Sequence, residues 1–301
     1  MKKCMLIINP HAGKAQAKAA LFEAVDILFQ GGYEATIFPT QKPKDATAFV
    51  QNRAKEYDLV VCCGGDGTFN ETVTGLMALE NPPPVGYLPA GTTNDLASSL
   101  RIPRNLSQAA EGIIEGASFG YDIGRFNDRY FSYIAAFGIF TEVSYATPQT
   151  LKNMLGHLAY LLQSMKTLGE VKSRRLRIES DGKVVEGEFL FGAVTNSTSV
   201  AGLFTLNPDE VQPDDGLFEA LFIRKPQNAI QTQQTINSLL SWNYEGSNIE
   251  FFHTSCLTVT SDEEIGWTLD GENGGKHRTV RIENCPQAVR ILRPEEIETV
   301  L

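Results

Sequence analysis

Short apolar runs alternate with amphipathic stretches through residues 1 to about 125, a pattern typical of strands that alternate with helices. The apolar runs are Cys4–Ile8, Tyr33–Phe38, Asp58–Cys63 and Val85–Leu88, and the helical stretches are Lys14–Gln30, Asp45–Lys55, Phe69–Leu79 and Asn94–Leu100. Such alternation predicts a parallel sheet covered by helices on both faces. The unbroken apolar run Leu59–Cys63 predicts a strand buried on both sides.

From about residue 126 the pattern changes to strands joined by turns such as Asp181-Gly182. The predicted strands are Arg129–Ala136, Arg174–Ser180, Lys183–Thr195, Leu217–Arg224, Ser255–Ser261, Trp267–Leu269 and Thr279–Glu283, with helices at Leu151–Leu168 and Ala229–Leu240. The chain is therefore expected to be an α/β protein in two parts. Residues 1–125 form the N-terminal parallel-sheet domain, and residues 126–287 form a C-terminal, mostly antiparallel β-sandwich domain. Residues 288–301, with a strand pattern at Val289–Leu292, are expected to return to the first domain.

Composition narrows the class of protein. A length of 301 residues, with 42% hydrophobic and 21% charged residues, suits a globular chain with two cores. The net charge of −10 argues against a nucleic-acid partner and against adsorption of the whole surface to an anionic membrane. No apolar run approaches the roughly 20 residues that span a bilayer. The chain begins with charged residues, but the apolar run that follows them is too short for a signal peptide. A cytoplasmic protein is therefore expected.

Cysteine and histidine usage indicates neither disulfides nor zinc. Five cysteines form an odd set without metal spacing, and four histidines are scattered without an HExxH motif.

The stretch Val60–Glu71 carries the clearest chemical signal. A buried strand ends in the glycine-rich turn Gly64-Gly65-Asp66-Gly67-Thr68, and a helix begins at once. Glycines let the backbone approach phosphate oxygens, and a helix N-terminus offers free N–H groups. An aspartate in such a loop repels phosphate unless magnesium lies between them. Taken alone, the stretch also fits an Asp-Gly turn with a threonine cap.

Two further loops follow predicted strands and open predicted helices. They are Asn9-Pro10-His11-Ala12-Gly13-Lys14 and Pro89-Ala90-Gly91-Thr92-Thr93-Asn94-Asp95. In a parallel sheet all three loops lie at the carboxyl ends of the strands, where ligands bind. Three such loops together predict a phosphate-binding edge.

These motifs resemble the catalytic domain of diacylglycerol kinases in its compact bacterial form: GGDGT after a buried strand, NPxxG after the first strand and GTxND downstream. Sphingosine kinases, and more distantly NAD kinases and phosphofructokinases, share parts of the GGDG loop. Two C-terminal segments extend the resemblance over nearly the whole chain. Gln212–Leu217 is similar to the family's DDG metal turn, and Leu269–Gly275 is similar to its DGE segment, which carries the catalytic base.

The resemblance implies transfer of the γ-phosphate of ATP to the hydroxyl of diacylglycerol, giving phosphatidic acid. It implies ATP contacts at Asn9, Pro10, His11, Ala12, Gly13, Lys14, Thr40, Gly64, Gly65, Asp66, Gly67, Thr68, Asn70, Glu71 and Thr92. It also implies Glu272 as the proton acceptor and a magnesium ion held by Asp215 and the backbone carbonyls of Gln212 and Leu217. Ala12 is a departure, because the family carries a small hydroxyl residue there.

An acidic network is expected around the phosphates. Asp66, Asp95, Asp122 and Asp270 are candidate members that would bind a catalytic magnesium, although turn chemistry alone also explains Asp122 and Asp270. Glu272 lies in the second predicted domain, so it is expected to face the phosphate loops across a cleft. In this interpretation Glu272 and Asp66 are the catalytic residues.

The predicted partners are ATP and a membrane-derived lipid alcohol such as diacylglycerol, with transient contact at the inner face of the membrane and a homodimer as a candidate assembly. The apolar stripe of Leu151–Leu168, followed by Lys166, Lys172, Arg174, Arg175 and Arg177, fits either a membrane-touching helix or a core helix.

Other acceptors stay open, including phosphatidylglycerol, sphingoid bases and polyprenols. An NAD kinase and a non-catalytic lipid-binding regulator are also alternatives. The GTxND and DGE motifs argue against the first, and intact GGDGT and DGE motifs argue against the second.

Overall fold

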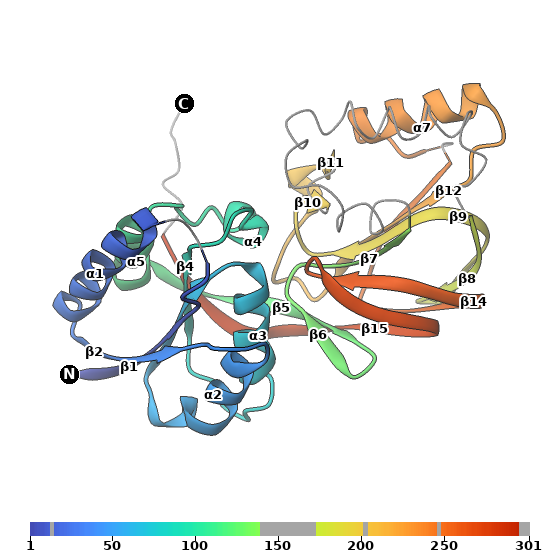
Figure 1. The fold of residues 1–301 in the computed structure, drawn as a ribbon. Helices are drawn as coiled ribbons and strands as arrows, with labels where there is room; N and C mark the ends of the chain where they lie inside the picture. Colours follow the sequence, from blue (N-terminus) through green and yellow to red (C-terminus); the bar gives the residue numbers. More distant parts are fainter. Residues whose placement is uncertain (13–14, 139–172, 201–203, 246–247, 295–301) are drawn as a thin grey trace. The chain divides into compact units, whose positions relative to one another are not determined.

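The computed structural model describes residues 1–12, 15–138, 173–200, 204–245 and 248–294. The predicted helix Leu151–Leu168 and the phosphate-loop residues Gly13 and Lys14 lie outside the described residues. The chain divides into two compact units. Unit 1 comprises Met1–Ile123 and Pro286–Leu301, and unit 2 comprises Gly124–Cys285. Figure 1 shows the helices and strands of both units.

Unit 1 is built on a parallel sheet, as the sequence predicts. Its strands are β1 (Lys2–Ile8), β2 (Tyr33–Pro39), β3 (Leu59–Gly64) and β4 (Val85–Pro89), arranged in the order β4-β3-β1-β2. All six residues of β3 are buried, which explains its unbroken apolar sequence. The end of β15 (Glu272–Arg293) adds a further parallel strand beside β4, with Ile291 opposite Val85.

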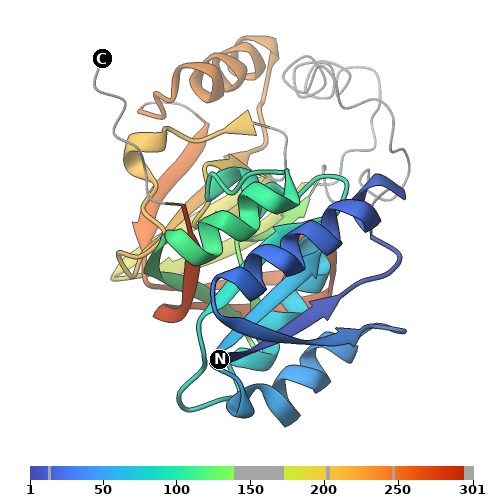
Figure 2. The same ribbon diagram turned by 90° about the vertical axis from the view of Figure 1, so that its left-hand side faces the viewer.

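Helices cover both faces of this sheet (Figure 2). They are α1 (Ala15–Gln30), α2 (Asp45–Arg53) with a 3₁₀ turn η1 (Ala54–Glu56), α3 (Asp66–Leu76), α4 (Asp95–Ser99) and α5 (Leu106–Glu115). Helix α1 packs with α5, and α2 packs with α3. Helix α5 is absent from the sequence prediction. Its N-cap is Asn105, whose side chain accepts hydrogen bonds from the N–H groups of Ser107 and Gln108.

Unit 2 is a β-rich sandwich, which confirms the predicted fold class. Its strands are β6 (Arg129–Phe131), β7 (Ile134–Gly138), β8 (Arg174–Ser180), β9 (Lys183–Thr195), β10 (Ser199–Val200), β11 (Phe204–Thr205), β12 (Phe218–Arg224), β13 (Ile249–Thr254) and β14 (Cys256–Leu269). Strands β7 and β8 each pair with both β9 and β14. A 3₁₀ turn η3 (Pro208–Glu210) and the helix α7 (Ala229–Ser241) complete the unit.

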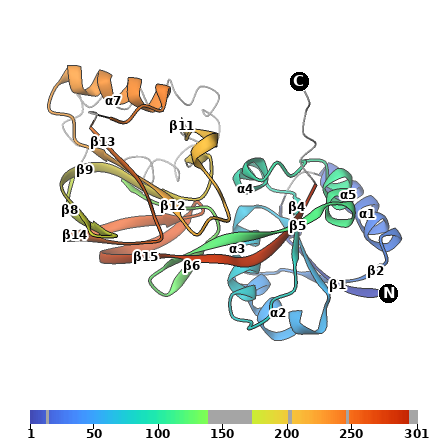
Figure 3. The same cartoon turned by 180° about the vertical axis from the view of Figure 1, so that it is seen from behind.

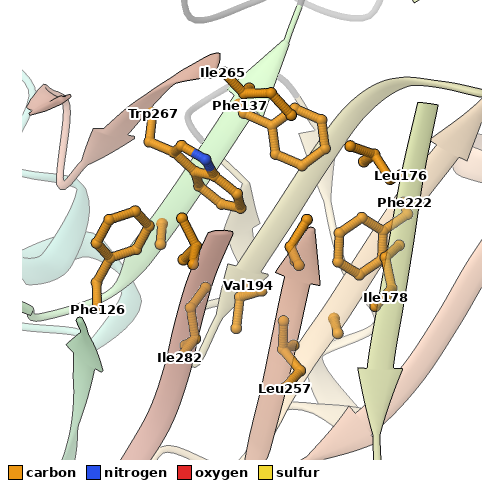
Figure 4. Close-up of a cluster of buried hydrophobic side chains, with 14 of the residues drawn as sticks. Phe126, Phe137, Leu176, Ile178, Val194, Phe222, Leu257, Ile265, Trp267 and Ile282 are labelled. Atoms are coloured by element: carbon orange, nitrogen blue, oxygen red, sulfur yellow. The ribbon is translucent and has the colours of Figure 1, made fainter. Parts of the chain in front are cut away.

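Aromatic and branched side chains fill the core of unit 2 (Figure 4). The Trp267 ring lies 4.7 Å from the Phe137 ring and 5.2 Å from the Phe126 ring, both in edge-to-face contacts. Such contacts favour one defined packing arrangement over a loose apolar cluster.

Two strands belong partly to each unit. They are β5 (Ala117–Phe126) and β15, and they pair with each other (Figure 3). The sequence predicts two short strands, Thr279–Glu283 and Val289–Leu292, where the structure has the single strand β15. It also predicts one strand over Arg129–Ala136, which the structure divides into β6 and β7.

Candidate active site

The loop after β1 is joined to the glycine-rich turn after β3. The Asn9 side-chain amide donates a hydrogen bond to Thr68 Oγ1 at 3.1 Å, and the Asn9 backbone N–H donates to the carbonyl of Cys63. Asn9 Oδ1 accepts from the N–H of His11 and so shapes its own loop. Thr40 is buried, and its N–H and hydroxyl both donate to the carbonyl of Ile8. The structure therefore brings three predicted ATP-contact residues, Asn9, Thr40 and Thr68, to one edge of the sheet.

Close backbone approach explains the glycines of two loops. A Cβ atom on Gly91 would lie 2.6 Å from the Cα of Gly65, and one on Gly64 would lie 2.6 Å from the Thr68 side chain. The N–H groups of Ala90 and Gly91 donate to the carbonyl of Gly64. The turns after β3 and β4 thus pack backbone to backbone, which side chains would prevent.

The N-terminus of α3 presents free donors at this edge. Helix α3 starts at Asp66 after Gly65, and no described residue accepts a hydrogen bond from the N–H groups of Asp66, Gly67 or Thr68. Such donors, together with the positive end of the helix dipole, suit an anion such as phosphate.

Asp66 connects the turn after β3 to α4. Its carboxylate accepts hydrogen bonds from the N–H groups of Asp95, at 3.1 Å, and Leu96, at 3.4 Å. Burial raises the pKa of Asp66, and these hydrogen bonds oppose the rise. Burial and the Asp66 charge raise the pKa of Asp95 to about 6. Asp66 and Asp95 therefore form a partly buried acidic pair.

The sequence places Asn94 in the loop after β4 without indicating a role for its side chain, and it does not indicate Tyr87 as a site residue. Asn94 is buried in a left-handed conformation, with φ of 54°, and its side-chain amide donates to the carbonyl of Gly91 at 2.9 Å. The hydroxyl of buried Tyr87 donates to Asn94 Oδ1 at 3.3 Å, and burial raises the Tyr87 pKa. The signal for Asn94 was its place after Gly91 and Thr92, because asparagine tolerates this conformation better than most residues.

The remaining predicted nucleotide residues differ in their surroundings. The Glu71 carboxylate accepts from the N–H groups of Lys44 and Ala46, so it caps α2. Pro10, His11 and Thr92 are exposed, while Ala12, Gly67 and Asn70 are partly exposed. Their contact with ATP stays a prediction.

Asp122 is a further candidate for the acidic network. It is fully buried on β5, and its Oδ1 accepts from the N–H of Gln287 at 2.7 Å. Among the described residues, no group of three histidine, cysteine, aspartate or glutamate side chains is arranged to hold a metal ion. Printed contacts join Asp66 to Asp95, and the place of Asp122 in the network stays a prediction.

Asp270 anchors a tight turn in unit 2. Its carboxylate accepts from the N–H groups of Ser132 at 2.6 Å, Tyr133 at 2.9 Å and Ile134 at 3.0 Å, and only 4% of the residue is exposed. These three bonds occupy the backbone where β6 ends and β7 begins, which is why the predicted single strand is divided. Asp270 therefore positions this turn, as turn chemistry alone predicts for this residue.

Glu272 directly follows this anchored turn. Leu269 pairs with Glu272, and Asp270 and Gly271 between them have φ values of 50° and 82°, as a two-residue hairpin requires. Glu272 is exposed, and its carboxylate bonds no described residue. A free carboxylate on a fixed turn suits a proton acceptor, whereas the predicted cleft between it and the phosphate loops stays a prediction.

The predicted metal turn supplies oxygen donors. Asp215 is exposed, and one carboxylate oxygen accepts from the N–H of Leu217 at 2.8 Å, which leaves the other oxygen for a ligand. Gly216 has a φ of 81°, so the turn is tight. A carboxylate with neighbouring carbonyls is the donor type that magnesium prefers, so these residues fit the implied ion.

The geometry of unit 1 defines a class: an α/β protein whose loops at the carboxyl edge of the sheet are suited to binding an anion. Comparison with protein families makes this class specific. Residues 3–126 match the diacylglycerol kinase catalytic domain, and residues 134–293 match the YegS C-terminal NAD kinase β-sandwich-like domain.

Individual relatives and a solved structure support the same family. The chain is 37% identical to a diacylglycerol kinase of Bacillus subtilis (strain 168) over 277 residues, covering 91% of both chains. It is 35% identical to a diacylglycerol kinase of Staphylococcus aureus (strain MRSA252), covering 98% of this chain and 94% of that one. The crystal structure of a candidate diacylglycerol kinase from Bacillus anthracis str. Sterne superposes with a TM-score of 0.81 at 27% identity, covering 98% and 96% of the two chains.

The chain belongs to the diacylglycerol kinase family, and it is a lipid kinase that uses ATP as co-substrate. Among the described residues, no helix is both long and apolar enough to cross a membrane.

Proposed function

We propose that the protein transfers the γ-phosphate of ATP to the hydroxyl of diacylglycerol and forms phosphatidic acid. The observation that carries the proposal is the edge at which Asn9, the free N–H groups of α3 and the Asp66–Asp95 pair converge. Phosphoryl transfer depends mainly on positioning and on neutralising charge, and this edge offers both. The names of the curated relatives support the choice of acceptor.

Each residue has a proposed role. The N–H groups of Asp66, Gly67 and Thr68 bind phosphate oxygens, and the Asn9 and Thr40 contacts hold the loop after β1 against that site. Glu272 accepts the proton of the lipid hydroxyl as that oxygen attacks the γ-phosphorus. The lipid oxygen gains the bond to phosphorus, and ADP leaves.

Two sets of residues are proposed to hold magnesium. Asp66 and Asp95 would hold one ion, and Asp215 with the carbonyls of Gln212 and Leu217 would hold a second in unit 2. Magnesium held by Asp66 and Asp95 would supply the positive charge that neutralises phosphate. We further propose that unit 1 is the ATP-binding domain and unit 2 the lipid-substrate domain, and that the protein works at the inner face of the membrane.

The test is turnover of ATP against a panel of acceptors, with the products identified by mass. The panel contains diacylglycerol, phosphatidylglycerol, a sphingoid base, a polyprenol and NAD, all presented with magnesium. A phosphatidic acid product formed faster than any other supports the proposal. Faster phosphorylation of another member would replace diacylglycerol as the acceptor.

A further inference from the structure

Helix α7 exposes an uncharged face. It contains no aspartate, glutamate, lysine, arginine or histidine, and the charge-free segment extends from Pro226 to Tyr244. Every other described α-helix carries at least one charged residue. Because the chain as a whole is 21% charged, a solvent-facing helix without charge needs an explanation.

One side of α7 belongs to the core of unit 2. Thr235, Ile236 and Leu239 are buried, and the N-cap of the helix is Asn228, whose side chain accepts a hydrogen bond from the N–H of Gln231. These contacts fix the rotation of the helix about its axis. The opposite side is therefore a defined surface, and Figure 1 shows α7 on the outside of unit 2.

That surface carries large apolar side chains. Ile230 is 71% exposed, Leu240 is 51% exposed, and Trp242, which follows the helix, is 40% exposed. At helical spacing, Ile230 and Leu240 share a face with four exposed amide or hydroxyl side chains: Gln233, Gln234, Asn237 and Ser241. We call Ile230, Leu240, Trp242 and these four residues the α7 face.

Trp242 is held in place. Its indole Nε1 donates a hydrogen bond to the carbonyl of Thr205 at 2.8 Å, and its backbone adopts a left-handed conformation that ends the helix. An aromatic residue with its polar atom satisfied by the protein and its ring partly exposed suits the boundary between water and lipid.

We propose that the α7 face docks on a neutral lipid surface and brings unit 2 to its substrate. This inference rests on the proposed function, because a long-chain diacylglycerol is held in a bilayer. The chemistry of the face matches an electrically neutral interface. Its apolar side chains enter the acyl boundary, and its amides hydrogen-bond to head groups without the cost of desolvating a charge.

The size and charge of the α7 face favour a neutral lipid surface over a protein partner or an anionic membrane. A helix of 13 residues spans about 20 Å, and one face of it is much smaller than the roughly 800 Å² that each partner commonly buries in a stable protein interface. Interfacial helices that bind anionic lipids carry lysine and arginine, and α7 has neither. Docking should therefore be weak, independent of anionic lipid and insensitive to salt.

The experiment measures binding of the full chain to phosphatidylcholine vesicles by sedimentation. The variant is Ile230→Ser with Leu240→Ser, and the matched control is Val184→Ser, because Val184 is a 51% exposed apolar residue of the same unit. Loss of each inserted side chain should weaken partitioning about tenfold. Hence we expect partitioning onto vesicles to weaken about a hundredfold for the double variant and to stay unchanged for the control, at both low and high salt.

Fluorescence gives a second measurement. The chain has two tryptophans, and Trp267 is only 3% exposed, so a spectral shift on adding vesicles reports Trp242. We expect a blue shift that disappears in Trp242→Phe. Unchanged partitioning of the double variant, or partitioning that requires phosphatidylglycerol and falls with salt, would overturn the proposal. The proposal would also be overturned if the wild type were a dimer and the double variant a monomer that binds vesicles equally well.

Activity separates this inference from the assignment of the acceptor. The double variant should keep its turnover of a water-dispersed short-chain diacylglycerol and lose turnover of long-chain diacylglycerol in phosphatidylcholine vesicles. If the wild type phosphorylates no diacylglycerol but the double variant still loses vesicle binding, the acceptor is wrong and the docking surface stands. A melting temperature equal to that of the wild type shows that the double variant is folded.

Discussion

Asp270 and Glu272 stand two positions apart on one hairpin and have opposite surroundings. Asp270 is buried and accepts three backbone hydrogen bonds, whereas Glu272 is exposed and bonds no described residue. The motif alone predicts both as acidic candidates. Their separate roles could not be predicted, because the three donors to Asp270 lie at Ser132–Ile134, far away in the sequence.

Glu272→Gln tests the proton acceptor. An amide of the same size keeps the hairpin but cannot take the proton, so turnover should fall roughly 10²–10⁴-fold, while ATP binding and the melting temperature stay near those of the wild type. Steady-state kinetics and ATP titration measure the two effects. Asp270→Asn is the matched control, and it should lower the melting temperature because it weakens three buried hydrogen bonds. Near-normal turnover in Glu272→Gln would remove this residue from the mechanism.

The raised pKa of Asp95 predicts a pH effect on stability. Its pKa is about 6 in the folded chain, because of burial and the Asp66 charge, against about 3.8 for an ordinary aspartate. Between these values the folded state binds more protons than the unfolded state, so stability falls as the pH rises through this window. Without magnesium or ATP, the melting temperature of the wild type should rise on going from pH 7.5 to 5.

Asp95→Asn isolates this contribution from the other titrating groups. The variant should be more stable than the wild type at pH 7.5, and the difference should shrink as the pH approaches 4. An equal response of the two proteins to pH, measured by calorimetry, would show that Asp95 does not carry the effect.

At the scale of elements, local patterns predict most strands and helices of unit 1 and the ends of β8 and β9. The strand β15 shows where local pattern is insufficient. The sequence predicts separate strands at Thr279–Glu283 and Val289–Leu292, yet β15 continues through the residues between them. Gln287 has a φ of 47°, and its N–H is satisfied by buried Asp122 on β5. That partner is distant in sequence, so the continuity of β15 depends on tertiary contact.

The turn at Asp215 carries a prediction about metal binding. If Asp215 and the carbonyls of Gln212 and Leu217 hold magnesium, the ion stabilises the folded state by mass action. Wild-type protein should then melt at a higher temperature with magnesium than with a chelator, and Asp215→Asn should lose this difference. Asparagine is acceptable in a plain turn, so it preserves the hydrogen bond to Leu217.

Asp214→Asn is the neighbouring control, and it should keep the magnesium response. An unchanged magnesium response in Asp215→Asn would show that this turn binds no ion. Turnover measured beside melting tells whether loss of the ion acts through stability or also through the reaction.

At the scale of the molecule, net charge connects the reaction to the membrane. The chain carries −10, and the proposed product, phosphatidic acid, makes the vesicle surface more negative with each turnover. Like charges repel over about 10 Å at 0.1 M salt and over about 30 Å at 0.01 M. The enzyme should therefore leave its substrate surface progressively as product accumulates at low salt, while the uncharged α7 face cannot compensate.

Progress curves on phosphatidylcholine vesicles that contain diacylglycerol test this expectation. At low ionic strength the rate should decline well before the substrate is consumed, and about 0.15 M salt should restore it, because salt screens the repulsion. Vesicles prepared with phosphatidic acid should start slowly at low salt, and those with an equal amount of added phosphatidylcholine should not. Identical curves at both salt concentrations would mean that a local basic surface outweighs the net charge. The rate on a water-dispersed short-chain substrate should not depend on salt, because no vesicle surface is present to repel the chain. If that rate still depended on salt, the effect would lie at the active site.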